Sequence, residues 1–138
     1  MRAVLDPNVF ISAALSPRGA PGRLFRHWLE GAYDVVVSPL LLKELRRALG
    51  YPKLAGRIPP QDAEGLVALL ARAAALTQDP DQPPPVSAPD PDDDYLIGLA
   101  AQSQSILISG DKDLLELVGR IPVYSPTEAL DLIENRAQ

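Results

Sequence analysis

Cysteine is missing from this chain, and histidine occurs once, as His27. The lack of cysteine excludes disulfides, thiolate metal sites and cysteine nucleophiles. A single histidine excludes any site built from several imidazoles, which disfavours most transition-metal catalysis. Carboxylates are the remaining metal ligands, and they favour hard cations such as Mg²⁺ or Mn²⁺.

Long apolar runs are missing too, because no stretch approaches the roughly 20 residues that span a bilayer. The N-terminus also lacks a basic segment followed by a long apolar one. We therefore expect a cytoplasmic protein with no membrane partner. The length of 138 residues is typical of one domain with a single core, so we expect residues 1–138 to form one domain.

Basic charge is scarce, because 13 Lys and Arg residues face 18 Asp and Glu residues, a net charge of −5. This balance argues against a broad basic surface for nucleic acid. It leaves room for a nucleic-acid substrate, since divalent cations bound by acids invert the local potential. A glycine-rich phosphate loop is absent, which excludes P-loop nucleotide hydrolysis.

Short apolar runs alternate with stretches of helical periodicity along the chain. The runs predict strands at 3–5, 33–37, 105–109 and 121–124, and the periodic stretches predict helices from Val9, Pro21, Pro39, Gln61 (to Leu76), the 90–94 segment, Leu114 and Pro126. Ser38-Pro39 and Ser125-Pro126 are start signals for helices, and Asn8 is expected to cap the first helix. The proline-rich segment 77–91 predicts a stiff surface loop. Such alternation is typical of an α/β fold with a parallel sheet.

Acidic residues follow two of these strands directly. Asp6 ends the first strand, and Asp111 and Asp113 follow the third. In an open parallel sheet, ligands bind at the carboxyl ends of the strands, so these acids are candidate site residues. The alternatives are that Asp6 is a turn residue and that Asp111 or Asp113 caps the next helix.

Two further acids lie at the margin of buried helical faces. Glu44 falls beside the apolar stripe of the helix from Pro39, where a carboxylate needs a partner; either it joins the site or it pairs with Arg47 or Lys43. Asp93 has the spacing of the buried face of its helix, although Asp94 takes its place if that helix starts one residue later. Several carboxylates brought together repel one another unless cations lie between them, so the pattern predicts a divalent metal site acting on phosphodiesters.

Four motifs in order carry a resemblance to a known family: Asp6-Pro7-Asn8-Val9, the segment 38–45 with Glu44, the segment 90–94, and Ile108 to Leu115. Together they resemble PIN domains over nearly the whole chain, most closely the toxin-type branch. The resemblance implies a Rossmann-like α/β/α sandwich with a mostly parallel sheet. It also implies a metal-dependent endoribonuclease that cuts single-stranded RNA, as the toxin of a toxin–antitoxin pair with a small antitoxin partner, and a homodimer.

The resemblance also implies roles for particular residues. Asp6, Glu44 and Asp93 match the family's metal-binding and catalytic acids, Asp111 joins them, and Asp113 completes the metal ligands. Asn8 and Ser109 match supporting positions.

Among the basic residues, Lys112 is the best candidate for a phosphate contact, because it lies between two proposed ligands. Two other functions compete with the nuclease. A catalytically silent PIN-like module would bind RNA or protein, and an aspartyl-phosphate enzyme would need a second aspartate where this chain has Asn8.

Overall fold

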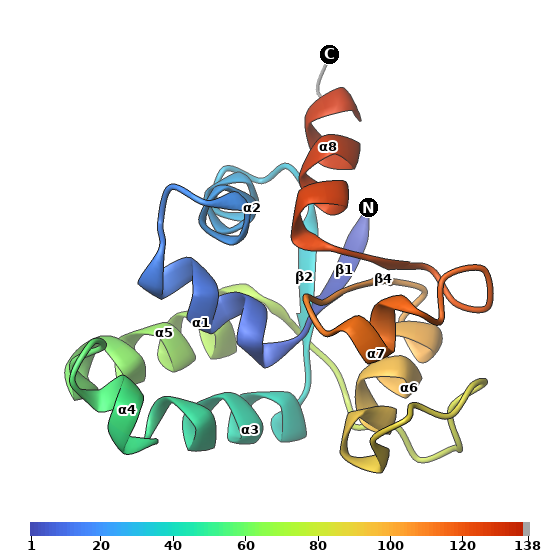
Figure 1. Cartoon of the computed structure of the whole chain (residues 1–138), viewed down its shortest axis with the longest axis horizontal. Helices are drawn as coiled ribbons and strands as arrows, with labels where there is room; N and C mark the ends of the chain where they lie inside the picture. Colours follow the sequence, from blue (N-terminus) through green and yellow to red (C-terminus); the bar gives the residue numbers. More distant parts are fainter. Residues whose placement is uncertain (137–138) are drawn as a thin grey trace.

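A computed structural model describes residues 1–136 and contains a parallel five-stranded sheet in the order β3-β2-β1-β4-β5 (Figure 1). The strands are β1 (Arg2–Leu5), β2 (Asp34–Val37), β3 (Ala75–Leu76), β4 (Ile106–Ile108) and β5 (Val123–Tyr124). The helices are α1 (Pro7–Leu15), α2 (Ala20–Leu29), α3 (Pro39–Leu49), α4 (Pro52–Ala55), α5 (Pro60–Ala73), α6 (Asp94–Gln102), α7 (Lys112–Leu115) and α8 (Pro126–Arg136), with a 3₁₀ turn at Pro91–Asp93. The predicted α/β class is confirmed.

Helices cover both faces of the sheet. Helices α1 to α5 lie to the left of the strands in Figure 1, whereas α6 and α7 lie to the right. The central strands are therefore shielded on both sides, and Ala3, Val4 and Leu5 of β1 are at most 1% exposed. This double burial explains why the strands are continuous apolar runs instead of alternating ones. Across residues 1–136, no helix is long and apolar enough to cross a membrane.

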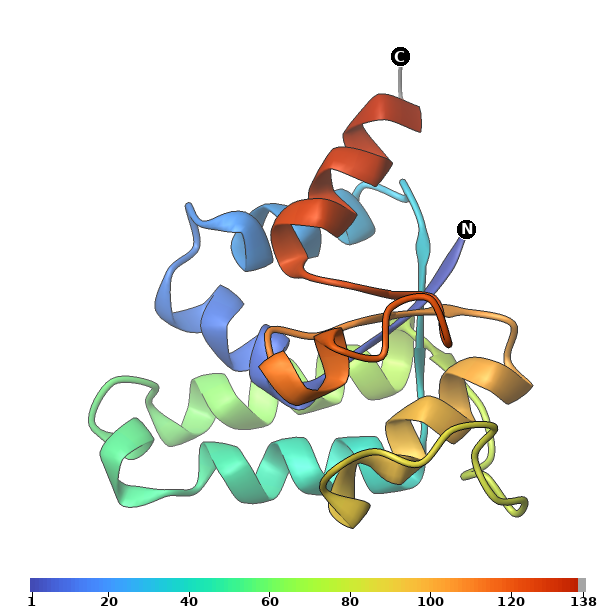
Figure 2. The same ribbon diagram turned by 45° about the vertical axis from the view of Figure 1, so that its right-hand side comes forward.

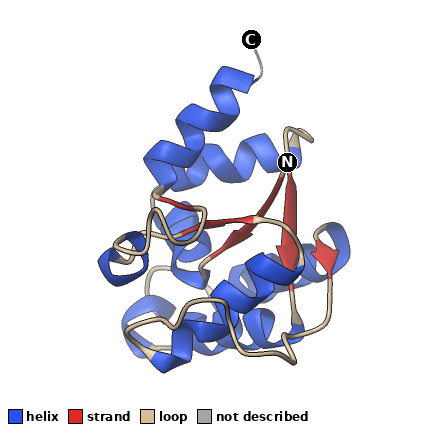
Figure 3. Cartoon of the chain, turned by 90° about the vertical axis from the view of Figure 1, so that its right-hand side faces the viewer, coloured by secondary structure: helices blue, strands red, loops and turns tan. Residues whose placement is uncertain are grey.

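The sheet changes its winding direction between β1 and β4. From β1 the chain adds β2 and β3 on one side, and then it crosses back to add β4 and β5 on the other. In Figure 3 the right-hand side of Figure 1 faces the viewer, and α6 lies on the viewer's side of the strands. The pairing aligns Leu5 with Ile108, so both strands end at the same level. Ligands of open α/β sheets bind at such a switch point.

The predicted helix at 61–76 is too long. Helix α5 ends at Ala73, and Ala75–Leu76 form β3, which pairs with Val36 and Val37 of β2. Two exposed residues are too few to show the alternation of apolar and polar residues that indicates a strand. This edge strand is therefore defined only by its pairing with β2. The short helix α4 was also not predicted, although Pro52 at its start is a usual first-turn residue.

The two Ser-Pro start signals are confirmed, but the predicted cap at Asn8 is wrong. The Ser38 hydroxyl accepts the Leu41 N–H at 3.2 Å, and the Ser125 hydroxyl accepts the Glu128 N–H at 3.1 Å. Helix α1 starts one residue earlier than Asn8, at Pro7, and Asp6 is its cap. Because proline fits the first helical turn without needing its N–H, the residue before it takes the capping position.

Of the predicted loop at 77–91, residues 77–90 form no helix or strand, whereas Pro91 begins the 3₁₀ turn, and the loop is held at several points. The Asp79 carboxylate accepts the Leu40 N–H at 3.0 Å, and the Asp94 carboxylate accepts the Ala88 N–H at 2.6 Å. Pro80 lies so close to Gly98 that a Cβ there would be 3.0 Å from its ring. The loop therefore holds the start of α6 against the start of α3, and in Figure 2 the first turn of α6 lies beside α3.

Candidate functional site

Asp6 is the most constrained of the predicted site residues. It follows β1 and is 6% exposed, and its own N–H donates to the Ile108 carbonyl at 2.9 Å. One carboxylate oxygen accepts the Asn8 N–H at 3.0 Å, and the other accepts the Ser109 hydroxyl at 2.8 Å. Burial raises the pKa of Asp6, while these two hydrogen bonds oppose the shift and the Asp111 charge adds to it.

A chain of hydrogen bonds links Asp6 to the acids that follow β4. The buried Ser109 hydroxyl donates to Asp6 and accepts the Asp111 N–H at 3.0 Å. The Asp111 carboxylate accepts the Asp113 N–H at 2.9 Å and caps α7, so the capping alternative holds for this residue. Asp111 is partly buried, whereas Lys112 and Asp113 are exposed. One serine therefore joins the ends of the two central strands, while Asn8 contributes its backbone N–H from an exposed position.

Asp93 is the last residue of the 3₁₀ turn and immediately precedes α6. Burial, followed by the charges of Asp6, Asp111, Asp90 and Asp92, raises the pKa of Asp93 to about 6. Asp93 makes no side-chain capping bond. Its surroundings therefore favour loss of negative charge or the arrival of a cation.

Glu44 is held by a cation of its own helix. The Arg47 guanidinium donates to its carboxylate at 2.6 Å, and the Glu44 side chain is 30% exposed. This is the pairing that the sequence offered as the alternative to a site role. The Asp92 charge also contributes to the raised pKa of Arg47, after the larger effect of Glu44.

Tyr95 was not predicted as a site residue, and it lies among the acids. Burial comes first among the causes that raise the pKa of Tyr95, and the charges of Asp6, Glu44 and Asp93 follow. Its phenol is therefore near carboxylates from three separate segments. The sequence offered no distinct signal for it, because an aromatic residue in the first turn of an apolar helix is usually a packing residue.

The donor set fits a hard divalent cation in its chemistry. Every candidate ligand is a carboxylate, and Asp6, Asp93 and Asp111 form no ion pair within residues 1–136. In the same described range, no group of three or more acidic or histidine side chains is arranged to hold an ion. Binding would thus require side chains to turn inward, with Glu44 leaving Arg47.

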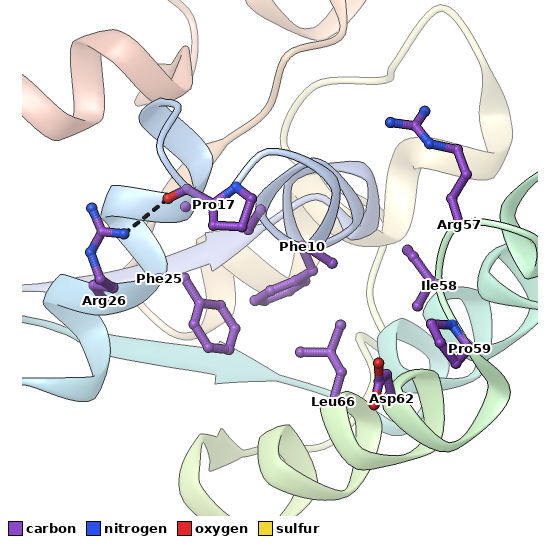
Figure 4. A pocket seen from close by; sticks show the side chains of 12 residues that line it. Phe10, Pro17, Phe25, Arg26, Arg57, Ile58, Pro59, Asp62 and Leu66 are labelled. Carbon is purple, nitrogen blue, oxygen red and sulfur yellow. Dashed lines mark hydrogen bonds between the residues drawn. The ribbon is translucent and has the colours of Figure 1, made fainter.

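A surface hollow of about 330 Å³ adjoins Asp111, and Asn8, Ser12 and Gly110 are among its other lining residues. A second cavity, of about 380 Å³, lies between α1, α2 and α5, where Phe10, Phe25 and Leu66 face the same space (Figure 4). None of the candidate site residues lines this second cavity. The acidic site therefore lies apart from the more apolar cavity.

Comparison with known proteins identifies relatives of this chain. A family model described as PIN domain matches residues 2–113, a range that contains every candidate site residue. The chain is also 32% identical over 117 residues to the uncharacterized protein MJ1680 of Methanocaldococcus jannaschii. That similarity covers 85% of this chain and 75% of the archaeal protein.

Proposed function

This chain belongs to the PIN-domain family, and on that premise we propose that it is a metal-dependent endoribonuclease acting on single-stranded RNA. PIN domains are generally nucleases, and the family membership supports hydrolysis of phosphodiester bonds. The observation that carries the finer proposal is the hydrogen-bond chain in which Ser109 joins Asp6 to Asp111 where β1 and β4 end, with Asp93 close enough for the charges of both to raise its pKa after the larger effect of burial. Three acids without cationic partners at a switch point form an environment that favours a divalent cation.

In this proposal Asp6, Glu44, Asp93, Asp111 and Asp113 hold Mg²⁺ or Mn²⁺. When bound, such a cation would neutralise charge on the phosphate and favour attack by water. Ser109 fixes both Asp6 and the Asp111 backbone, so the two central ligands keep a constant spacing. Asn8 supports Asp6 from the first turn of α1. Lys112, exposed between Asp111 and Asp113, contacts a phosphate of the RNA.

The test is cleavage of an end-labelled single-stranded RNA panel with Mg²⁺ or Mn²⁺, comparing the wild type with Asp6→Asn. We expect metal-dependent cleavage by the wild type and loss of cleavage in the variant. Asp131→Asn, which changes an exposed aspartate of α8, is the matched control and keeps activity. Equal inactivity of the wild type and Asp6→Asn across the panel, with both proteins folded, would refute the enzyme proposal.

A catalytically silent module that binds RNA or protein is the second candidate. It is favoured by one observation, namely that no three acids within residues 1–136 are arranged to hold an ion. Mn²⁺ titration followed by electron paramagnetic resonance separates the two candidates. A stoichiometric Mn²⁺ site that Asp6→Asn weakens supports the nuclease, whereas RNA binding with no Mn²⁺ site supports the silent module.

We further propose that the protein acts in the cytoplasm as the toxin of a toxin–antitoxin pair, as a homodimer. The resemblance of the motifs to toxin-type PIN proteins supports this role. A small reading frame immediately upstream that encodes a DNA-binding antitoxin would agree with it. Light scattering of the purified chain measures the oligomeric state, and a monomer at micromolar concentration would refute the dimer.

A further inference from the structure

Three contacts hold the Arg47 guanidinium beside Glu44, which is one of the proposed metal ligands. One amino group donates to the Glu44 carboxylate at 2.6 Å, and the other donates to the Tyr51 hydroxyl at 3.0 Å. The guanidinium carbon also lies 6.0 Å from the centroid of the Tyr51 ring. Because contacts on two sides restrict the long side chain, Arg47 is better ordered than an isolated surface arginine.

The position of Arg47 leaves it open to an incoming ligand. Its side chain is 60% exposed, and Tyr51 is 42% exposed. Its partner Glu44 is the only proposed metal ligand with an ion pair in the part of the chain that the structure describes. An exposed arginine can exchange a carboxylate for a phosphate, because its planar fork matches both groups.

We propose that Arg47 is a substrate-responsive positioning residue: it holds Glu44 while the site is free of RNA, and it releases Glu44 when an RNA phosphate takes its guanidinium. This inference rests on the proposed function and goes beyond it, because it makes RNA binding and metal binding assist each other. The freed Glu44 carboxylate turns toward Asp6, Asp93 and Asp111, where it adds a ligand for the cation. By thermodynamic linkage, the cation strengthens RNA binding by the same factor.

The ion pair between Arg47 and Glu44 is exposed to solvent, so its effect on the affinity for Mn²⁺ is modest. Exposed ion pairs change binding or stability by factors of about two to five. Arg47→Ala should therefore raise the affinity for Mn²⁺ about two- to fivefold in the absence of RNA. The same variant should weaken binding of single-stranded RNA and abolish the gain in Mn²⁺ affinity that RNA gives the wild type.

The chain provides a matched control in Arg46. Its side chain is also 60% exposed, and it pairs with Glu64 of α5 at 3.4 Å instead of with a site residue. Arg46→Ala removes the same charge one residue away and should leave the coupling between RNA and Mn²⁺ intact. A general effect of charge on Mn²⁺ affinity would appear in both variants.

The experiment measures Mn²⁺ affinity by electron paramagnetic resonance for the wild type, Arg47→Ala and Arg46→Ala. Each titration is run with and without a phosphorothioate-linked single-stranded RNA, whose integrity is checked afterwards. Loss of the RNA-dependent gain in Arg47→Ala alone supports the proposal. An unchanged gain in Arg47→Ala, or no gain in the wild type, overturns it.

Two further outcomes separate this inference from the nuclease proposal. A wild type that cleaves RNA and binds Mn²⁺ but shows no coupling overturns the inference and leaves the nuclease standing. A wild type that binds no Mn²⁺ overturns both. A double-mutant cycle is the second measurement, because it isolates the interaction between Arg47 and Glu44. In a protein that already carries Glu44→Gln, Arg47→Ala should no longer change the Mn²⁺ affinity. A persistent effect in that background would show that Arg47 acts by charge alone, against the proposal.

Discussion

Replacing Asp93 by asparagine should stabilise the metal-free protein above pH 6 and leave it unchanged near pH 4. The pKa of Asp93 is raised to about 6 by burial and by the charges of Asp6 and Asp111. Folding therefore favours the protonated carboxyl. Its contribution to stability is fully present below the unfolded pKa of 3.8 and is lost as the pH rises through 6. Asparagine resembles the protonated form at every pH, so the variant avoids this loss.

The size of the effect follows from the shift. A pKa of about 6 against an ordinary 3.8 corresponds to about 3 kcal/mol at 1.36 kcal/mol per pH unit. Asp93 is partly exposed, and solvent screening reduces this to about 1 to 1.5 kcal/mol. For a chain of this length, that free energy raises the melting temperature by about 3 to 5 °C.

The measurement is urea unfolding of both proteins at pH 4 and pH 7.5 in chelator, with Asp131→Asn as the control on α8. Added Mn²⁺ should stabilise the wild type more than Asp93→Asn, since only the wild type keeps the full set of proposed ligands. A stability difference of the same size at both pH values would refute the electrostatic reasoning. So would a variant less stable than the wild type at pH 7.5.

Three further changes give separate outcomes. Ser109→Ala should weaken Mn²⁺ binding about 10-fold or more, since it removes the hydroxyl that orients Asp6. The control Ser103→Ala, which changes another buried serine, should leave Mn²⁺ binding unchanged. Equal losses of Mn²⁺ affinity in the two variants would contradict the role of Ser109. Gly22→Ala should destabilise the fold by about 3 kcal/mol or more in urea unfolding, because a Cβ there would lie 2.1 Å from the Pro17 carbonyl oxygen. Lys112→Ala should weaken RNA binding, by fluorescence anisotropy, more than Mn²⁺ binding, and similar losses of both would refute a phosphate role.

The sheet and most helix starts could be predicted because their signals are local. Three β-branched residues in a row predict β2, and a serine before a proline predicts the start of α3. Asp6 and Asp111 could be placed at the same edge because parallel strands end at one side of a sheet. These inferences need only the order of elements and the right-handed crossover rule.

The missed features depend on contacts between distant segments. The two-residue strand β3 is defined by its pairing with β2. Its sequence, Ala75–Leu76, continues the helix-forming composition of α5. The surroundings of Tyr95 depend on Asp6, which follows β1, and on Glu44 of α3, and no local pattern reveals this. The partner of Glu44 was one of two lysine or arginine candidates, and only the side-chain geometry selects Arg47.

The three successive aspartates 92–94 show how one residue between neighbours of the same type acquires a distinct role. Asp92 donates its N–H to the Asp90 carboxylate, which caps the 3₁₀ turn, and Asp94 accepts the Ala88 N–H and so anchors the loop. Asp93 has neither task, and burial together with the charges of Asp6 and Asp111 raises its pKa. A helix start is uncertain by one or two residues from sequence, and one residue turns a side chain by about 100°. The 3₁₀ turn before α6 removes that ambiguity, and on this basis we assign the third acid of the proposed site to Asp93 rather than Asp94.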